Sequence, residues 1–189
     1  MLQKDKALLV VIDVQGRLLP AIHEADATVT SIARLIRGFR IVGAPILVTE
    51  QYRQGLGETD PRIQEAVAEK DPLTGGVHPF APIEKMSFSC MMDPGFRAAW
   101  EASGRKQVVL CGIEAHVCVA QTALQLIEAG AHVEIAADAV SSRSAQNRDI
   151  ALRRLQKEGA TITSVESAVF EMLEVCGTDA FKSWVKVIR

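Results

Sequence analysis

Short runs of apolar residues alternate along the chain with segments in which apolar residues recur every three or four positions. The first run is "ALLVVI" at residues 7–12, and another, "QVVLCGI", spans 107–113. The second pattern places apolar side chains on one side of a predicted helix, at Val29, Ile32, Ile36 and Phe39. Apolar strands that alternate with amphipathic helices are typical of a parallel sheet covered on both faces.

One phrase recurs three times: a helical pattern, a Gly-Ala step and a short apolar strand. It is seen in "GFRIVGAPILVTE", "IEAGAHVEIAADA" and "QKEGATITSVES". Gly43, Gly130 and Gly159 are each predicted to take the left-handed conformation after a helix. We predict an α/β, three-layer Rossmann-like fold with a central parallel sheet of about six strands, formed by one domain over residues 1–189. Residues 51–92, which carry several prolines and glycines, are predicted to cross over the sheet edge as a long excursion.

Composition narrows the classes of partner. The 189 residues are 48% hydrophobic and 23% charged, with a net charge of −2 and no basic run, so we expect neither nucleic acid nor a membrane as a partner. The four cysteines (Cys90, Cys111, Cys118 and Cys176) form no CxxC pair, and no secretion signal is evident. We expect reduced thiols, a cytoplasmic location, a small-molecule substrate and a homo-oligomer.

Two reactive side chains follow predicted strands. Asp13 comes directly after "ALLVVI", and Cys118 comes a few residues after "VVLCGI", where a helical pattern begins. Open α/β sheets bind ligands at the carboxyl ends of their strands, where the strand order reverses. If these are the first strands of the two halves of the sheet, Asp13 and Cys118 are neighbours. A helix N-terminus favours a thiolate over a thiol, so the pKa of Cys118 is expected to be lowered.

Asp13 has a structural alternative, because it can cap the next turn. The other catalytic or binding functions that use such residues require partner residues that this sequence lacks. A dehalogenase-type phosphatase needs a second aspartate where Gln15 stands, and the GxGxxG of dinucleotide folds is absent. A tyrosine-phosphatase loop needs an arginine where Leu124 stands. Cys111, inside its strand, fits a buried structural thiol. We predict no metal site, because no two histidines show ligand spacing; they are His23, His78, His116 and His132.

Five segments together resemble the isochorismatase-like cysteine hydrolase family. They are "LLVVIDVQ", "EKMSFS", "CGIEAHVCVAQTAL", "ADAVSSRS" and "GATITSVES", in the family's order and spacing over essentially the whole chain. The segment "TEQYRQGLG" is similar to the corresponding segment of the isochorismatase-domain-containing branch.

The resemblance implies a catalytic triad of Asp13, Lys85 and Cys118. It also implies a cis peptide bond between Ile113 and Glu114, which would turn the amide of Glu114 to form an oxyanion hole with that of Cys118. The implied reaction is attack by the Cys118 sulfur on a carbonyl-like carbon, followed by hydrolysis of the covalent intermediate. No cofactor is required. Lys85 would lower the pKa of the thiol further, and Asp13 would act as the general base.

The sequence departs from two branches of this family. Metal-binding nicotinamidases carry histidines where this chain has "VTEQYRQGLGETD", which makes nicotinamidase activity doubtful. True isochorismatases cleave a vinyl ether without needing the cysteine. We therefore expect a hydrolase that acts on a small amide, carbamoyl or related carbonyl compound; the alternative is a non-catalytic binding or scaffold protein. Proximity to the triad segments suggests five substrate-binding residues: Gln15, Gln51, Tyr52, Phe88 and His116.

Overall fold

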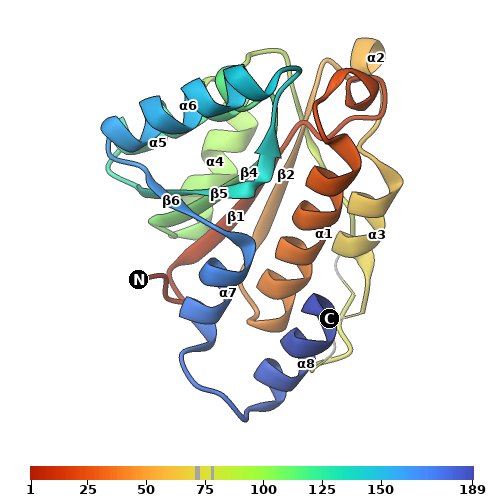
Figure 1. The fold of residues 1–189 in the computed structure, drawn as a ribbon, viewed down its shortest axis with the longest axis vertical. Coiled ribbons are helices and arrows are strands. Elements are labelled where there is room, and N and C mark those ends of the chain that lie inside the picture. The colour runs from red at the N-terminus through yellow and green to blue at the C-terminus, as the bar shows by residue number, and fades with distance from the viewer. Residues whose placement is uncertain (71–72, 78) are drawn as a thin grey trace.

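A computed structural model describes residues 1–70, 73–77 and 79–189 of the chain (Figure 1). Its six-stranded sheet has the order β3-β2-β1-β4-β5-β6, and every pair of neighbouring strands is parallel. The strands are β1 (Ala7–Ile12), β2 (Ile46–Gln51), β3 (Ile83–Lys85), β4 (Gln107–Ile113), β5 (His132–Ser141) and β6 (Thr161–Thr163). The predicted parallel sheet of about six strands is confirmed.

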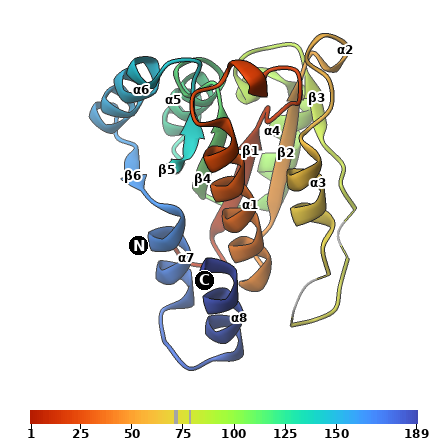
Figure 2. The ribbon, with the colours of Figure 1, turned by 45° about the vertical axis from the view of Figure 1, so that its right-hand side comes forward.

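Helices cover both faces of this sheet (Figures 1 and 2). One face packs against α1 (Ala25–Ile41), α3 (Pro61–Ala68), α7 (Val165–Leu173) and α8 (Asp179–Ile188). The other packs against α4 (Pro94–Ser103), α5 (Ala120–Glu128) and α6 (Ala145–Lys157). The short elements are α2 (Arg53–Leu56), two 3-10 turns (Leu19–Ala21 and Cys90–Met92) and a π-helical turn (Ala115–Val119). The predicted three-layer arrangement is confirmed.

Strand β1 shows why helices must pack on both faces of the sheet. All six of its residues are buried. Leu9 and Val11 join the core under α1, whereas Leu8, Val10 and Ile12 join the core under α4 and α5. Successive side chains of a strand point to opposite faces, so a strand without polar positions must be buried on both sides.

Glycines end the helices that lead back into the sheet. Gly43, Gly130 and Gly159 have φ angles of 72°, 81° and 101°, as the recurring Gly-Ala phrase predicts. The expected excursion over residues 51–92 contains α2, α3 and the edge strand β3. Among the described residues, no helix combines the length and apolar character that crossing a bilayer requires.

The strand order reverses between β1 and β4, which lie side by side at the centre of the sheet. Their register aligns Ile12 with Gly112, so both strands end at the same edge. Residues after β1 and after β4 therefore meet at the switch point, where open α/β sheets bind ligands.

Candidate active site

Asp13 leaves β1 with a left-handed backbone (φ 54°) and is 1% exposed. Its Oδ1 accepts a 2.7 Å hydrogen bond from Oγ1 of Thr49 on β2, and its Oδ2 lies 2.7 Å from Nζ of Lys85. A positive φ in a residue other than glycine costs of order 1 kcal/mol or more and persists only where its surroundings hold it. Here the hydroxyl of Thr49 and the ammonium of Lys85 hold the carboxylate in place.

Lys85 is the last residue of β3, and its side chain is 0% exposed. Besides Asp13, its ammonium donates to Oε1 of Gln51 at 2.9 Å and to the carbonyl oxygens of Ser87 and Phe88 at 3.1 and 3.2 Å. Residue Gln51 is the direct β2 partner of Lys85, so their side chains emerge on the same face of the sheet. The ammonium thus has a carboxylate and three neutral oxygens as partners, which offset the loss of water.

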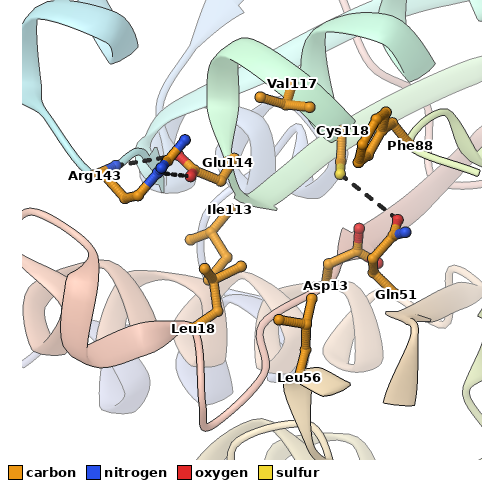
Figure 3. Close-up of a pocket in the computed structure, with 10 residues that line it drawn as sticks. All are labelled: Asp13, Leu18, Gln51, Leu56, Phe88, Ile113, Glu114, Val117, Cys118 and Arg143. Atoms are coloured by element: carbon orange, nitrogen blue, oxygen red, sulfur yellow. Dashed lines mark hydrogen bonds and ion pairs between the residues drawn. The ribbon is translucent and has the colours of Figure 1, made fainter. Parts of the chain in front are cut away.

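Cys118 lies in the π-helical turn Ala115–Val119, which continues directly into α5. The predicted position at a helix start is therefore confirmed. The residue is 7% exposed, and its Sγ lies 4.0 Å from Oε1 of Gln51. In Figure 3 the sulfur points toward Gln51, and Asp13 lies beside Gln51 on the same side of the cavity. The topology brings Asp13, Lys85 and Cys118 to one edge of the sheet.

The pKa of Cys118 is raised, contrary to the sequence-based expectation. Burial is the largest cause, because it disfavours the charged thiolate. The negative charge of Asp13 raises the pKa further, whereas the positive charge of Lys85 lowers it. In the resting protein the sulfur is therefore a thiol that faces a carboxylate.

The peptide bond before Glu114 also differs from the expectation. The described residues contain no cis peptide bond, so the implied cis bond between Ile113 and Glu114 is wrong for this structure. A cis bond without proline costs about 2.5–4 kcal/mol. Gly112 has φ 125°, and the π-helical turn begins three residues later, at Ala115.

A cavity of about 350 Å³ opens over the Cys118 sulfur (Figure 3). This volume is at the low end for ligand pockets, which suits a small molecule. Most of the wall is apolar, and polar side chains stand at its two ends. The lining residues are Asp13, Leu18, Gln51, Leu56, Phe88, Ile113, Glu114, Val117, Cys118 and Arg143.

Two of the five residues suggested for substrate binding, Gln51 and Phe88, line this cavity. Gln15 is fully buried beside it: its amide donates to the carbonyl oxygens of Gln51 and Gly57 and accepts from the Gln51 N–H. Gln15 therefore fixes the backbone of Gln51.

The remaining two suggested residues, Tyr52 and His116, do not line the cavity either. Tyr52 is 46% exposed, and its ring covers Gly55. The Nδ1 of His116 lies 3.0 Å from Oγ of Ser142 and 3.4 Å from Oε2 of Glu114. His116 thus contacts Glu114, which lines the cavity, but does not line the cavity itself.

Two residues of the site had no role in the sequence analysis. Thr49 donates to Asp13 from within β2, and the only signal available in the sequence is a polar residue directly after the apolar run "ILV". Arg143 lies in the quoted motif "ADAVSSRS", and its Nε donates to Oε1 of Glu114 at 2.5 Å. No group of three or more His, Cys, Asp or Glu residues that could hold a metal ion occurs in the described part of the chain, from which His78 is missing.

Comparisons with known proteins agree with the fold and its motifs. The Isochorismatase domain family model matches residues 7–167. The chain is 35% identical to isochorismatase domain-containing protein 2 of Danio rerio over 182 residues, which cover 96% of this chain and 86% of that protein.

Two solved structures illustrate the likeness of fold. A structure described as a MAR1 ribonuclease from Caenorhabditis elegans is 34% identical, with a TM-score of 0.87, and the match covers 99% of this chain and 91% of that one. The YcaC gene product of Escherichia coli, described as an octameric hydrolase of unknown specificity, is 23% identical with a TM-score of 0.87; coverage is 99% and 88%. At that identity the second likeness concerns the fold alone. The matched family model covers residues 7–167, which include the five quoted segments and most of the chain. The chain therefore belongs to the isochorismatase domain family.

Proposed function

We propose that the protein is a cysteine hydrolase that acts on a small amide, carbamoyl or related carbonyl substrate. The observation that carries this proposal is the convergence of a buried Asp13–Lys85 pair with the Cys118 thiol at the floor of one cavity. A buried ion pair beside a free thiol has a high desolvation cost and little structural benefit, which favours a role in chemistry.

In the proposed first step, the Cys118 sulfur attacks the carbonyl carbon while its proton moves to a carboxylate oxygen of Asp13. The raised pKa of the thiol makes this concerted transfer necessary, because little thiolate is present beforehand. The negative charge that develops on the carbonyl oxygen would be stabilised by a backbone N–H group at the helix start, for which we propose that of Cys118. The trans bond before Glu114 removes the reason for which the resemblance implied the amide of Glu114.

The tetrahedral intermediate then collapses. Asp13 returns the proton to the leaving nitrogen or oxygen, the bond to that atom breaks, and a thioester on Cys118 remains. A water molecule that gives its proton to Asp13 attacks the thioester carbon. The carbon–sulfur bond breaks, the acid product leaves, and the proton returns to the sulfur. Lys85 stays paired with Asp13 and fixes the carboxylate toward the thiol throughout.

A turnover screen tests the proposal. Small amides, carbamoyl compounds and esters are incubated with the parent protein, with Cys118→Ala and with Cys111→Ala, whose thiol is buried in β4 away from the cavity. Parent and Cys111→Ala should hydrolyse the same compounds, and Cys118→Ala should hydrolyse none. Mass spectrometry of the quenched parent reaction should find the acyl group on the Cys118 peptide. Equal turnover by Cys118→Ala would overturn the proposal, and no turnover together with no adduct would favour the non-catalytic alternative.

We also propose that the chain forms a homo-oligomer. The E. coli relative in fold is described as octameric. Sedimentation equilibrium of the purified chain measures its mass directly, and a monomer at all concentrations would contradict this proposal.

A further inference from the structure

The cavity has a second polar end, opposite the sulfur. Arg143 lines it there and is the one positively charged residue among the described lining residues. It follows β5, which pairs with β4, so the topology places it at the same sheet edge as Cys118. Figure 3 shows Arg143 and Glu114 on one side of the cavity and Cys118, Asp13 and Gln51 on the other.

Glu114 holds Arg143 in a defined orientation. One carboxylate oxygen, Oε1, accepts from the Nε of Arg143 at 2.5 Å, and the other, Oε2, accepts from its backbone N–H at 3.1 Å. A guanidinium group carries five N–H donors, and this arrangement uses only the one on Nε. No partner for Nη1 or Nη2 is found in the described part of the chain. The Arg143 side chain is 60% exposed, so these donors can reach a ligand.

The loop under Arg143 is fixed as well. Ser142 is fully buried; its carbonyl oxygen accepts from the His23 N–H at 2.9 Å, and its Oγ lies 3.0 Å from Nδ1 of His116. On its other side, the Ser144 hydroxyl caps α6 by accepting from the Asn147 N–H. Anchors on both sides reduce the conformational entropy that Arg143 loses when a ligand binds.

The wall between the two ends is apolar, with Leu18, Ile113 and Val117 lining it. A ligand that fills the cavity therefore needs a reactive carbonyl at one end, a short apolar middle and a strong hydrogen-bond acceptor at the other. A planar guanidinium edge with two free donors matches a carboxylate in a bidentate pair.

We propose that Arg143 binds the carboxylate of the substrate, so that the substrates are small amides, carbamoyl compounds or esters that carry a carboxylate at the end remote from the scissile bond. This inference deepens the proposed function and rests on it for the identity of the reacting end. It makes Arg143 a determinant of specificity that takes no part in bond cleavage.

Binding measurements in a variant that lacks the proposed nucleophile test the role of Arg143. The probes are succinamate and succinamide, which differ only in carboxylate against amide, and the one-carbon-longer pair glutaramate and glutaramide. Dissociation constants are measured by NMR titration in a Cys118→Ala background, alone and combined with Arg143→Gln, Arg143→Lys or Arg153→Gln. Arg153 is an exposed residue of α6 outside the cavity and is the matched control for loss of one positive charge.

In the background protein, at least one acid should bind about tenfold or more tightly than its amide, as expected for a charge-assisted hydrogen bond. Arg143→Gln should abolish this preference while the amide affinity stays unchanged. Arg143→Lys should retain part of it, and Arg153→Gln all of it. Equal binding of acid and amide, no saturable binding of either acid, or a preference that survives Arg143→Gln would overturn the inference. These outcomes are independent of the proposed nucleophile, which is tested separately by the adduct on Cys118.

Discussion

The Nζ atom of Lys85 lies 2.7 Å from Oδ2 of Asp13, and the two side chains are 0% and 1% exposed. The pair joins the end of the edge strand β3 to the end of the central strand β1, with β2 between them. Two opposite charges this deeply buried depend on each other, because either one alone would lie unpaired away from water.

Lys85→Met should lower the free energy of unfolding by about 3–5 kcal/mol, because it leaves the Asp13 carboxylate buried without its cation. The double variant Lys85→Met with Asp13→Asn should recover a large part of this loss, since it removes both charges. Urea denaturation of the parent, both single variants and the double variant measures the coupling. Additive losses in the double variant would show that the pair has no mutual stabilisation.

Asp13→Asn should have opposite effects on hydrolysis and on alkylation. Without the general base, hydrolysis should fall by about 10²-fold or more. Burial is the largest cause of the raised pKa of Cys118, and the negative charge of Asp13 is the next, so removal of that charge lowers the pKa and leaves the ammonium of Lys85 to favour the thiolate. Iodoacetamide should therefore modify Cys118 at lower pH in Asp13→Asn than in the parent. Mass spectrometry of the Cys118 peptide over a pH series measures this shift, and Cys118→Ala serves as the blank. An unchanged labelling profile would contradict the influence of the Asp13 charge on the Cys118 thiol.

The arrangement of the fold follows from local patterns in the sequence. The apolar run at 7–12 indicates a strand that is buried on both faces, and the glycines at the ends of helices indicate a local left-handed conformation. Both features are found as predicted. Strand β3 is different, because three residues are too few to show a period. Only its pairing with β2 makes the segment a strand, so Lys85 could be singled out by family resemblance alone.

The chemistry of the site was less predictable than its location. The helix start at Cys118 is visible in the sequence, but the pKa of the thiol depends on burial and on Asp13, which lies 105 positions earlier. Arg143 gained a role only through Glu114, 29 positions earlier, which holds its guanidinium at the cavity. Such contacts between distant residues leave no spacing signal in a single sequence.

Gly112→Ala should disrupt the junction between β1 and β4. Gly112 has φ 125°, and a Cβ atom added there would lie 2.1 Å from the carbonyl oxygen of Ile12. That atom belongs to the backbone of the neighbouring strand, so relief requires the two strands to move apart. We expect a loss of more than about 3 kcal/mol in the free energy of unfolding. Gly43→Ala is the matched control, since Gly43 also has a positive φ (72°) but open space around it, and it should cost about 1–2 kcal/mol. Equal losses in thermal and urea unfolding would mean that the steric contact at Ile12 is unimportant.

The buried thiol of Cys90 should make the fold sensitive to alkaline pH. Cys90 is 0% exposed, with its Sγ 3.8 Å from Oγ1 of Thr49. Burial is the main cause that raises the pKa of Cys90 from 9.0 to about 11, and the charge of Asp13 adds to it. The unfolded chain loses this proton near pH 9, whereas the folded chain keeps it until about pH 11. Stability from this group is therefore fully present below pH 9 and is lost as the pH rises to about 11.

Within that window, one such group lowers the free energy of unfolding by about 1.4 kcal/mol per pH unit. Cys90→Ala should be less stable than the parent near neutral pH, because it leaves a cavity in the core. Its free energy of unfolding should nevertheless decline less steeply with pH, by the contribution of about one proton. Urea denaturation from neutral pH to about pH 11 compares the slopes of the parent, Cys90→Ala and Cys176→Ala, whose exposed thiol makes it the control. Parallel curves for the parent and Cys90→Ala would show that the Cys90 thiol ionises alike in the folded and unfolded chain, and that its burial has no influence on stability at high pH.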